Sequence, residues 1–373
     1  MRIGITCFAG IGGSGIVATE LGKGLAGRGH DIHFVCANMP FRLEDFSAHL
    51  SFHQVHLYPY PVLQHPQYDL ALASRLAEVI DEQELDVIHM HYAIPHAISA
   101  YLAKQICHRP IKVITTVHGT DTRLVGLDPA YRPITRFGLE QSDGVTAVSH
   151  YLAESTREDF TLTRPLHVIP NFVDTERFRR RTYPACYREN FARPEEKLLV
   201  HVSNMRPVKR INDVVEVFAR VQRHIPSRLV FVGDGPDRMA AERLASDMQI
   251  GDRVTFAGNM SNVEQVLAIA DLFVLPSEVE SFGLAALEAM SCSTPVVAYA
   301  IGGIPEVVDD GVTGMLAPLY DVEMLANSAL AILGNENRLA EMRKAARLRV
   351  ETLFNQDVGL TAYEQYYADF STD

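Results

Sequence analysis

The feature that most restricts the fold of this chain is the alternation of short apolar runs with longer amphipathic segments. Runs rich in Ile, Val and Phe end in turn residues, and segments with helical periodicity follow them almost from end to end. Strands that alternate with helices form parallel sheets from right-handed β-α-β units. We expect strands at 2–8, 31–36, 51–57, 86–90, 111–117, 144–148, 166–169, 198–203, 228–233, 253–257, 272–275, 295–299 and 315–317.

The intervening segments predict helices at 14–28, 69–83, 96–107, 209–224, 237–248, 262–269, 283–291 and 321–333. A length of 373 residues suits two domains at roughly 150 residues each. The predicted strands fall into two groups on either side of a polar, Pro-containing stretch. We therefore predict an α/β protein of two doubly wound Rossmann-like domains, 1–169 and 170–350. The tail, 351–373, is expected to form a helix that returns to the first domain.

Composition and charge exclude several classes of protein. Hydrophobic residues make up 47% and charged residues 21%, as in ordinary globular proteins. The formal net charge of −12 argues against a nucleic-acid binder, because a phosphate backbone needs a basic face. The 5 cysteines contain no C-x-x-C pair, which disfavours a disulfide framework or a zinc ribbon.

Apolar runs of about ten residues are too short to span a bilayer. A strand at the N-terminus leaves no room for a signal peptide. We expect a soluble, cytoplasmic protein without membrane insertion, and the sequence leaves a homo-oligomer open.

The first strand leads into a glycine-rich loop. Gly10, Gly12 and Gly15 match G-x-G-x-x-G, a pattern typical of dinucleotide sites. The next predicted strand ends in Ala37-Asn38 without an acidic residue to hold a ribose, which disfavours a nicotinamide cofactor. A glycine loop before a helix still suits an anion. An NAD-dependent oxidoreductase remains an alternative at this point.

Two histidines lie in a predicted strand near the middle of the first half. His89 and His91 lie on one face of the strand at 86–90, and Tyr92 stands at its exit. Because no Asp or Glu follows nearby to complete a ligand set, we favour buried structural histidines over a metal pair.

The strand at 111–117 ends in a polar loop. His118, Thr120 and Asp121 lie there, where ligands of parallel sheets bind. We expect a binding role, and the alternative is a capping Asp beside a buried His.

Three cations stand at a predicted helix start in the second half. Arg206, Lys209 and Arg210 oppose the helix dipole there unless an anion is bound. We interpret the cluster as a phosphate site, with exposed surface charge as the alternative.

Two carboxylates flank another helix start. Glu280 precedes the helix and Glu288 lies inside it, with seven residues between them. Carboxylates bind vicinal hydroxyls of a sugar or ribose, and the N–H groups of Phe282, Gly283 and Leu284 point to the same space. A glycosidase acid/base pair is the alternative, but the helix start favours an anionic ligand.

With these motifs in order, the chain resembles the retaining glycosyltransferases of family four, the GT-B type with two Rossmann-like domains facing a cleft. The resemblance rests on Gly12-Gly13, His118-Gly119, 170–174, 233–236, Glu280-x7-Glu288 and 302–306. Within the family, segments 12–22, 40–43, 118–121, 201–210 and 281–283 are similar to those of the bacillithiol-pathway enzymes that glycosylate L-malate.

The resemblance implies transfer of N-acetylglucosamine from UDP-N-acetylglucosamine to the hydroxyl of L-malate with retention, the first step of bacillithiol synthesis. It implies no metal and no cofactor beyond the sugar nucleotide, because the departing phosphate takes the acceptor's proton. Another nucleotide sugar or acceptor, such as a lipid or a polysaccharide, is the alternative within the family. A catalytically inactive nucleotide-sugar sensor is the alternative outside it.

The resemblance also implies roles for individual residues. Lys209 and Arg206 would stabilise the diphosphate, Glu280 and His118 would contact the sugar, and Glu288 would hold the ribose. The family's usual arginine is replaced by Asn204, so either Arg206 or Arg210 takes its place. The remaining donor-binding residues would be Gly13, Ser14, Asn204, Phe282, Gly283 and Leu284, and the acceptor-binding residues Ser14, Tyr92, Thr120 and Arg136.

Overall fold

A computed structural model describes residues 1–10, 12–43, 47–58, 65–181 and 185–370 of the chain. The chain divides into two compact units. Unit 1 comprises Met1–Asn171 and Asp357–Asp373, and unit 2 comprises Phe172–Gln356. Unit 1 therefore takes chain from both ends of the sequence, whereas unit 2 is one continuous stretch. The sequence-based bounds of 170–350 for the second domain begin and end slightly before those of unit 2.

Unit 1 is built on a parallel sheet in the order β3-β2-β1-β4-β5-β6-β7 among the described residues. The strands are β1 (Arg2–Thr6), β2 (Asp31–Cys36), β3 (Leu50–Gln54), β4 (Val87–His91), β5 (Lys112–Val117), β6 (Gly144–Ala147) and β7 (His167–Val168). All lie where the apolar runs predict them. The strand order reverses between β1 and β4, so the loops that follow these two strands begin side by side.

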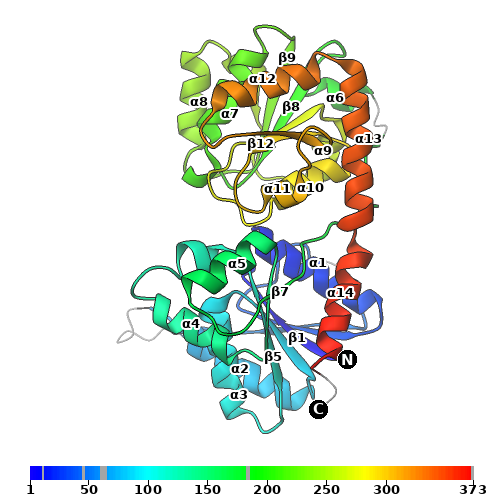
Figure 1. Cartoon of the computed structure of the whole chain (residues 1–373). Helices are drawn as coiled ribbons and strands as arrows, with labels where there is room; N and C mark the ends of the chain where they lie inside the picture. The colour runs from blue at the N-terminus through cyan, green and yellow to red at the C-terminus, as the bar shows by residue number, and fades with distance from the viewer. Residues whose placement is uncertain (11, 44–46, 59–64, 182–184, 371–373) are drawn as a thin grey trace. The chain divides into compact units, whose positions relative to one another are not determined.

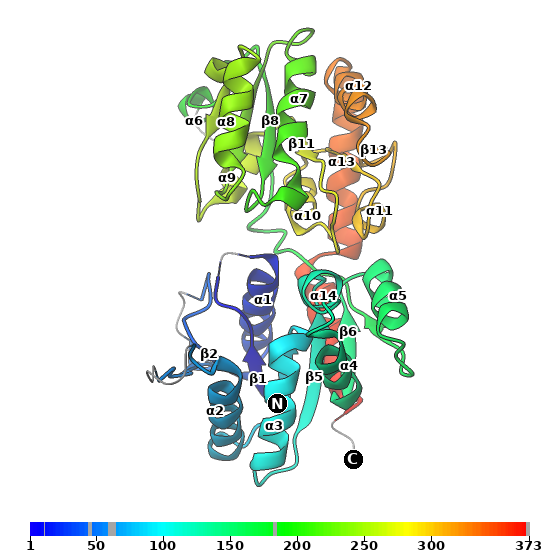
Figure 2. The ribbon, with the colours of Figure 1, turned by 90° about the vertical axis from the view of Figure 1, so that its left-hand side faces the viewer.

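Helices cover both faces of this sheet (Figure 1). They are α1 (Gly13–Gly27), α2 (Tyr68–Glu82), α3 (Ile98–Ile106), α4 (Arg132–Gln141), α5 (His150–Asp159) and α14 (Gln356–Ala368), with helical turns η1 (Ala93–Ala97) and η2 (Thr120–Leu124). The helices α2, α3 and α4 lie on one face, and α1 and α14 lie on the other (Figures 1 and 2). On the first face, Leu72 and Leu76 of α2 pack with Ile88 and Met90 of β4.

The last helix, α14, is anchored in unit 1 by buried aromatic rings and by ion pairs. Tyr363 and Tyr367 are 1% and 0% exposed. The Tyr367 hydroxyl lies 2.7 Å from His89 Nδ1 in β4. Arg28, after α1, pairs with Asp357 and Glu364 of α14. Residues far apart in sequence thus complete one core, and the tyrosines of the tail are packing residues.

Unit 2 repeats the architecture with the order β10-β9-β8-β11-β12-β13, again parallel among the described residues. Its strands are β8 (Lys197–Val202), β9 (Ser227–Val232), β10 (Val254–Phe256), β11 (Leu272–Leu275), β12 (Val296–Tyr299) and β13 (Gly314–Ala317). The reversal now falls between β8 and β11, so the loops after these strands are neighbours.

The helices of unit 2 lie on both faces of its sheet (Figures 1 and 2). They are α6 (Ala185–Glu189), α7 (Ile211–Val221), α8 (Arg238–Asp247), α9 (Val263–Ile269), α10 (Leu284–Ser291), α11 (Ile304–Val307), α12 (Val322–Leu333) and α13 (Glu336–Leu353), with turns η3 (Pro207–Lys209) and η4 (Gly251–Arg253). The core on one face joins α7, α8 and α12 to the sheet. On the other face, α10 packs against α9 and α13.

Several observed helices are absent from those expected from sequence, and the longest of them is α13. It is rich in charge, and only Leu339, Met342, Ala346 and Val350 are buried. A narrow apolar stripe of this kind gives a weak periodic signal. None of the described helices is long and apolar enough to cross a membrane.

Candidate active site

In both units the predicted site residues lie on loops that leave the carboxyl ends of the strands. Unit 1 carries them after β1, β4 and β5, and unit 2 carries them after β8 and β11. These loops flank the reversal of strand order in each sheet, where ligands of doubly wound folds bind.

The loop after β1 leads directly into α1. A Cβ on Gly15 would lie 2.5 Å from the Phe8 carbonyl oxygen, so the last glycine of the G-x-G-x-x-G pattern is required by packing. Gly10 and Gly12 face open space, and Ile11 lies outside the described residues. The Gly12 backbone is extended and no side chain caps α1. The first N–H groups of this helix are therefore available to an anion.

Three of the predicted residues of unit 1 are brought together at this point. The Ser14 hydroxyl, in the first turn of α1, donates to the Tyr92 hydroxyl at 2.8 Å. The Tyr92 ring lies 5.5 Å from the His118 ring and 5.3 Å from the Phe8 ring, measured between centroids. Tyr92 follows β4 with a φ of 103°, a left-handed conformation that a non-glycine residue adopts only under local constraint.

The histidines of β4 have different partners. His89 bonds Tyr367 through Nδ1 and Thr116 through Nε2, at 2.7 and 2.6 Å, as expected of a structural histidine. His91 lies 2.9 Å from His118, Nδ1 to Nε2. Burial lowers the pKa of His118 to about 3 and holds the pKa of His91 well below its usual value. Both imidazoles are therefore neutral at physiological pH.

Asp121 fixes the loop that presents His118. Its carboxylate accepts hydrogen bonds from the backbone N–H groups of His118 and Gly119, each at 3.0 Å, and of Ala93 at 2.8 Å. Asp121 is 2% exposed, and burial raises its pKa to about 6. The capping role considered for Asp121 is thus what the structure shows, whereas His118 itself is only partly buried.

The remaining two acceptor-binding candidates of unit 1, Thr120 and Arg136, have fewer contacts. Thr120 is partly buried and begins the turn η2. Arg136 is exposed on α4, and within the described ranges no partner is found for its guanidinium. Glu140, four residues further along α4, accepts from Thr163 and forms no ion pair with Arg136 among the described residues. The structure joins Ser14, Tyr92 and His118, but places Arg136 in contact with none of them.

In unit 2 the central contact is an ion pair between two neighbouring loops. Lys209 Nζ, after β8, lies 2.5 Å from Glu280 Oε2, after β11. Their side chains are 21% and 16% exposed. The backbone of Glu278 also donates to Val208 at 2.9 Å, which ties the loops together. A cation and a carboxylate predicted separately from sequence thus form one site.

The structure distinguishes the two arginines that were candidates for the place of the family's usual cation. Arg210 is bound by both oxygens of Asp213 at 2.7 and 2.9 Å, and its guanidinium lies 4.6 Å from the Tyr320 ring centroid. These contacts raise the pKa of Arg210 above its usual value, with the Asp213 hydrogen bond as the largest cause. Arg206 is exposed and, in the part of the chain that the structure describes, unpaired. The guanidinium of Arg210 is thus engaged by its neighbours, whereas that of Arg206 has no partner within the described ranges.

Two buried polar atoms in the same loops have no hydrogen-bond partner among the described residues. They are Asn204 Oδ1, after β8, and Ser277 Oγ, after β11. A Cβ on Gly235 would lie 2.0 Å from the Asn204 carbonyl oxygen, so the glycine loop after β9 packs directly on this segment. Buried polar atoms are nearly always paired in native proteins. Both atoms lie in the loops after β8 and β11, the two loops that also carry Lys209 and Glu280.

The start of α10 completes the site of unit 2. Gly283 caps the helix with a φ of 103°, which favours glycine. Phe282 is buried and contacts Phe354, and Leu284 is partly buried. Glu288, inside the helix, is 6% exposed. This helix start follows directly on the loop that carries Glu280.

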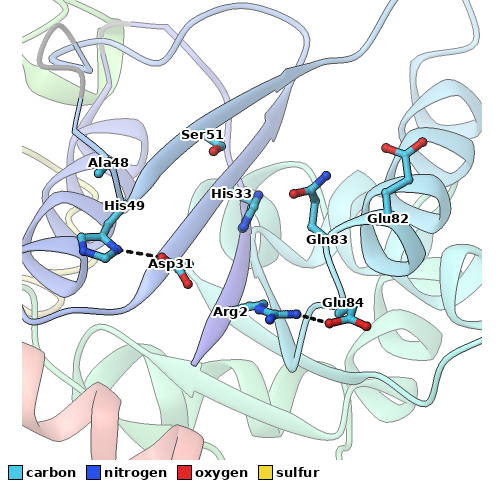
Figure 3. Close-up of a pocket in the computed structure, with 9 residues that line it drawn as sticks. All are labelled: Arg2, Asp31, His33, Ala48, His49, Ser51, Glu82, Gln83 and Glu84. Atoms are coloured by element: carbon cyan, nitrogen blue, oxygen red, sulfur yellow. Dashed lines mark hydrogen bonds and ion pairs between the residues drawn. The ribbon is translucent and has the colours of Figure 1, made fainter.

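The pocket shown in Figure 3 lies at the amino ends of the unit 1 strands, on the side of the sheet opposite the loops that carry the candidate site. It has a volume of about 300 Å³, and its residues come from the amino ends of β1 and β2, the start of β3 and the end of α2. The charged groups labelled there are largely paired with one another, Arg2 with Glu84 and His49 with Asp31 (Figure 3). Across the described ranges, no group of three or more His, Cys, Asp or Glu side chains is arranged to hold a metal ion.

Comparison with known families gives a match in each half of the chain. Residues 11–177 match Glycosyltransferase Family 4, and residues 187–349 match Glycosyl transferases group 1. Over its full length the chain is 44% identical to the N-acetyl-alpha-D-glucosaminyl L-malate synthase of Bacillus anthracis, of which it covers 98%. The chain belongs to glycosyltransferase family 4. This confirms the family suggested by the sequence motifs.

The names of more distant relatives of this family 4 protein indicate other substrates. A GDP-mannose-dependent phosphatidylinositol monomannoside mannosyltransferase of Mycolicibacterium smegmatis is 29% identical, with 77% of this chain and 78% of the relative covered. Two solved structures share the fold over nearly the whole chain. Sucrose-phosphate synthase from Thermosynechococcus elongatus has a TM-score of 0.84 at 23% identity, with 100% of each chain covered, and Anabaena HepE in complex with UDP has 0.82 at 18%, with 99% of each covered. The GT-B class of α/β fold, with two Rossmann-like units, is thus confirmed.

Sequence reasoning missed two residues that the structure brings to these loops. His91 is buried, as expected of a structural histidine, but its contact with His118 was not predicted. Ser277 is not among the predicted site residues, and its hydroxyl is buried with no partner among the described residues. A polar residue directly after a buried strand is the signal that would have found Ser277. Nothing in the sequence distinguishes His91 from His89.

Proposed function

We propose that the protein is a retaining glycosyltransferase that moves N-acetylglucosamine from UDP-N-acetylglucosamine to the hydroxyl of L-malate, the first step of bacillithiol synthesis. The Lys209–Glu280 contact at 2.5 Å carries the transferase assignment, because it joins a cation and a hydroxyl-binding carboxylate at the reversal of strand order. The name of the 44% identical relative supports this donor sugar and acceptor.

The chemistry assigned to unit 2 is stabilisation of a departing diphosphate. The bond from the sugar C1 to the phosphate oxygen breaks, a bond from C1 to the malate hydroxyl oxygen forms, and the malate proton passes to the phosphate. Lys209 and Arg206 offset the charge that grows on UDP. Glu280 binds hydroxyls of the sugar and Glu288 those of the ribose. Asn204, Phe282, Gly283 and Leu284 line the donor, and Glu280 also keeps Lys209 in place before the donor arrives.

Acceptor recognition is assigned to unit 1. L-malate carries two carboxylates and therefore needs hydrogen-bond donors and positive charge. The start of α1 supplies free N–H groups at Gly13 and Ser14, beside the Ser14–Tyr92 pair. Thr120 adds a hydroxyl, and Arg136 adds a guanidinium suited to a carboxylate. His118 is assigned to the 6-hydroxyl of the transferred sugar.

The test is an assay of the purified protein with a matrix of donors and acceptors. The donors are UDP-N-acetylglucosamine, UDP-glucose and GDP-mannose, and the acceptors are L-malate, inositol 3-phosphate and phosphatidylinositol. Mass spectrometry detects the product, and proton NMR of the glycoside gives its anomeric configuration. We expect α-linked N-acetylglucosaminyl malate. Transfer confined to GDP-mannose and a lipid would assign the protein to the activity of its more distant relatives.

We propose that transfer needs no metal and no cofactor besides the sugar nucleotide. The cations and helix starts described above neutralise the diphosphate. We expect EDTA treatment to leave most of the activity in place. Activity that returns only on addition of magnesium or manganese would show that the protein's own charges are insufficient.

We place this activity in the cytoplasm. Cys7, Cys36, Cys107 and Cys292 are free thiols, and the sulfur atoms of Cys7 and Cys36 lie 4.0 Å apart without a bond. Neighbouring thiols of this kind persist in a reducing compartment.

A further inference from the structure

His91 is a buried polar residue that the proposed chemistry does not use. It ends β4, is 0% exposed, and lies with its ring nearly parallel to that of His118, at 24° and 5.1 Å between centroids. Its Nδ1 is 2.9 Å from His118 Nε2. Its other nitrogen, Nε2, is buried and has no hydrogen-bond partner among the described residues.

These contacts determine where the protons of the pair lie. Burial depresses the pKa of both imidazoles, so each carries a single ring proton, and one proton lies between the two rings. If His118 donated that proton, the proton of His91 would sit on Nε2 as a buried N–H without an acceptor. If His91 donates it, Nε2 carries only a lone pair. Orphaned buried N–H groups are the rarer of the two in native proteins, so the second arrangement is favoured.

We infer that His91 is a positioning residue whose Nδ1–H donates to His118 Nε2 and so keeps the proton of His118 on Nδ1. Nδ1 of His118 then becomes an obligatory hydrogen-bond donor, and it has no partner within the described part of the chain. We assign an oxygen of the transferred sugar as its acceptor, an assignment that rests on the proposed function. His91 thus determines that His118 donates to the 6-hydroxyl rather than accepting from it.

The backbone around the pair holds both rings in place. His96 Nδ1 donates to the carbonyl oxygen of His91 at 2.5 Å. Asp121 accepts from the N–H groups of His118 and Gly119 and, across the sheet, of Ala93. The two strand ends that carry His91 and His118 are therefore tied to one buried carboxylate, and the ring-to-ring hydrogen bond has little freedom to change partners.

The first test reads the tautomer directly and needs no substrate. The protein is labelled with 15N-histidine, two-bond proton–nitrogen correlations are recorded, and His118 is assigned by loss of its signals in His118→Gln. We expect a pyrrole-like Nδ1 and a pyridine-like Nε2 for His118. A pyridine-like Nδ1 would overturn the inference, whatever reaction the protein catalyses.

The second test separates positioning from a general packing role. His91→Asn keeps an N–H donor close to the position of Nδ1, whereas His91→Leu removes it. Each is assayed with UDP-N-acetylglucosamine and with its 6-deoxy analogue. We expect the wild type and His91→Asn to prefer the 6-hydroxyl donor by about fivefold in kcat/KM, the effect of one hydrogen bond. In His91→Leu the preference should fall to about twofold or less.

His89→Leu is the matched control, because His89 is buried on the same face of the same strand and does not touch His118. We expect it to keep the preference for the 6-hydroxyl donor. An unchanged preference in His91→Leu, or its loss in a folded His91→Asn, would overturn the inference. Absence of any transfer by the wild type would reject the proposed function, and the nitrogen spectra would still decide the tautomer.

Discussion

Single residues of the site show how paired charges are kept ready for a ligand. Lys209 and Glu280 lie on different loops and reach each other at 2.5 Å with about four fifths of each side chain covered. A partly buried cation without a partner would be unfavourable, so the carboxylate stabilises the free protein as well as serving the ligand. Removing either partner therefore affects the loops and the chemistry together.

We predict that Lys209→Ala lowers kcat with UDP-N-acetylglucosamine and L-malate by roughly 10²–10³, about 3–4 kcal/mol of transition-state stabilisation. Lys197→Ala is the control, because Lys197 also pairs with a carboxylate in unit 2, Glu336, but away from these loops. Product formation by mass spectrometry and thermal unfolding are measured on both variants. Full activity in Lys209→Ala with a normal melting curve would remove the phosphate assignment.

Arg136 supports a second prediction at this scale. Its guanidinium is exposed and unpaired within the described ranges, so it is free to bind a carboxylate of malate. Lysine keeps the charge but loses the bidentate geometry. We expect Arg136→Lys to raise the KM for L-malate about tenfold, as for loss of a charge-assisted hydrogen bond of about 1.5 kcal/mol. The KM for the sugar nucleotide should barely change.

Arg132→Lys, on the same helix, is the control for Arg136. Arg132 is exposed as well, but it is bound to the carbonyl oxygen of Asp159. Steady-state kinetics with each substrate varied in turn separate the two variants. Equal shifts of both KM values in Arg136→Lys, or no shift in either, would show that Arg136 does not bind L-malate.

Among the elements, α10 depends on one backbone conformation at its start. Gly283 has a φ of 103°, and a Cβ there would meet the end of the Ile304 side chain at 2.6 Å. We predict that Gly283→Ala costs about 1–2 kcal/mol of folding stability and also raises the KM for the donor, because the N–H groups of this helix start move.

Gly311→Ala isolates the backbone strain from the effect on the site. Gly311 has a φ of 76° and open space around it, in a turn away from α10. We expect Gly311→Ala to lower the free energy of unfolding, measured by chemical denaturation, about as much as Gly283→Ala does. The KM for the donor should stay unchanged. A donor KM that stays unchanged in Gly283→Ala would mean that the start of α10 does not contact the sugar nucleotide.

At the scale of the whole molecule, the two units differ in how many buried neutral histidines they hold. Burial lowers the pKa of His89 and His118 to about 3 and of His96 to about 4 in unit 1. Unit 2 holds His201, whose pKa burial lowers to about 4. A histidine with a folded-state pKa below its usual 6.5 takes up its proton mainly when unfolded. Stability therefore falls as the pH drops from about 6.5 toward the folded-state pKa.

We predict that unit 1 loses protection before unit 2 on mild acidification. Each such histidine contributes about 1.4 kcal/mol of destabilisation per pH unit. Asp121, with a pKa raised to about 6, acts in the opposite direction but is a single group. Hydrogen exchange read by mass spectrometry at about pH 7 and about pH 5, corrected for intrinsic rates, assigns the loss to each unit. Equal loss in both units, or earlier loss in unit 2, would contradict the prediction.

Local sequence patterns predict the strands and most of the longer helices, and they single out the loops that carry the candidate site. The observed strands lie at the predicted apolar runs, because the period of hydrophobic residues depends only on local geometry. Lys209, Glu280 and Gly283 are recognised from their place next to a strand or a helix start. The family follows from the order and spacing of such motifs. The helix α13 was missed because its apolar stripe is narrow.

Which residues come into contact depends on the tertiary structure. His91 and His118 come from different strands, and their contact depends on β4 lying beside β5. Arg210 is paired because the fold places Asp213 and Tyr320 around it, whereas its neighbour Arg206 has no partner among the described residues. The tail joins unit 1 because Tyr363 and Tyr367 find space against its sheet. Such contacts join residues distant in sequence, and local patterns carry no information about them.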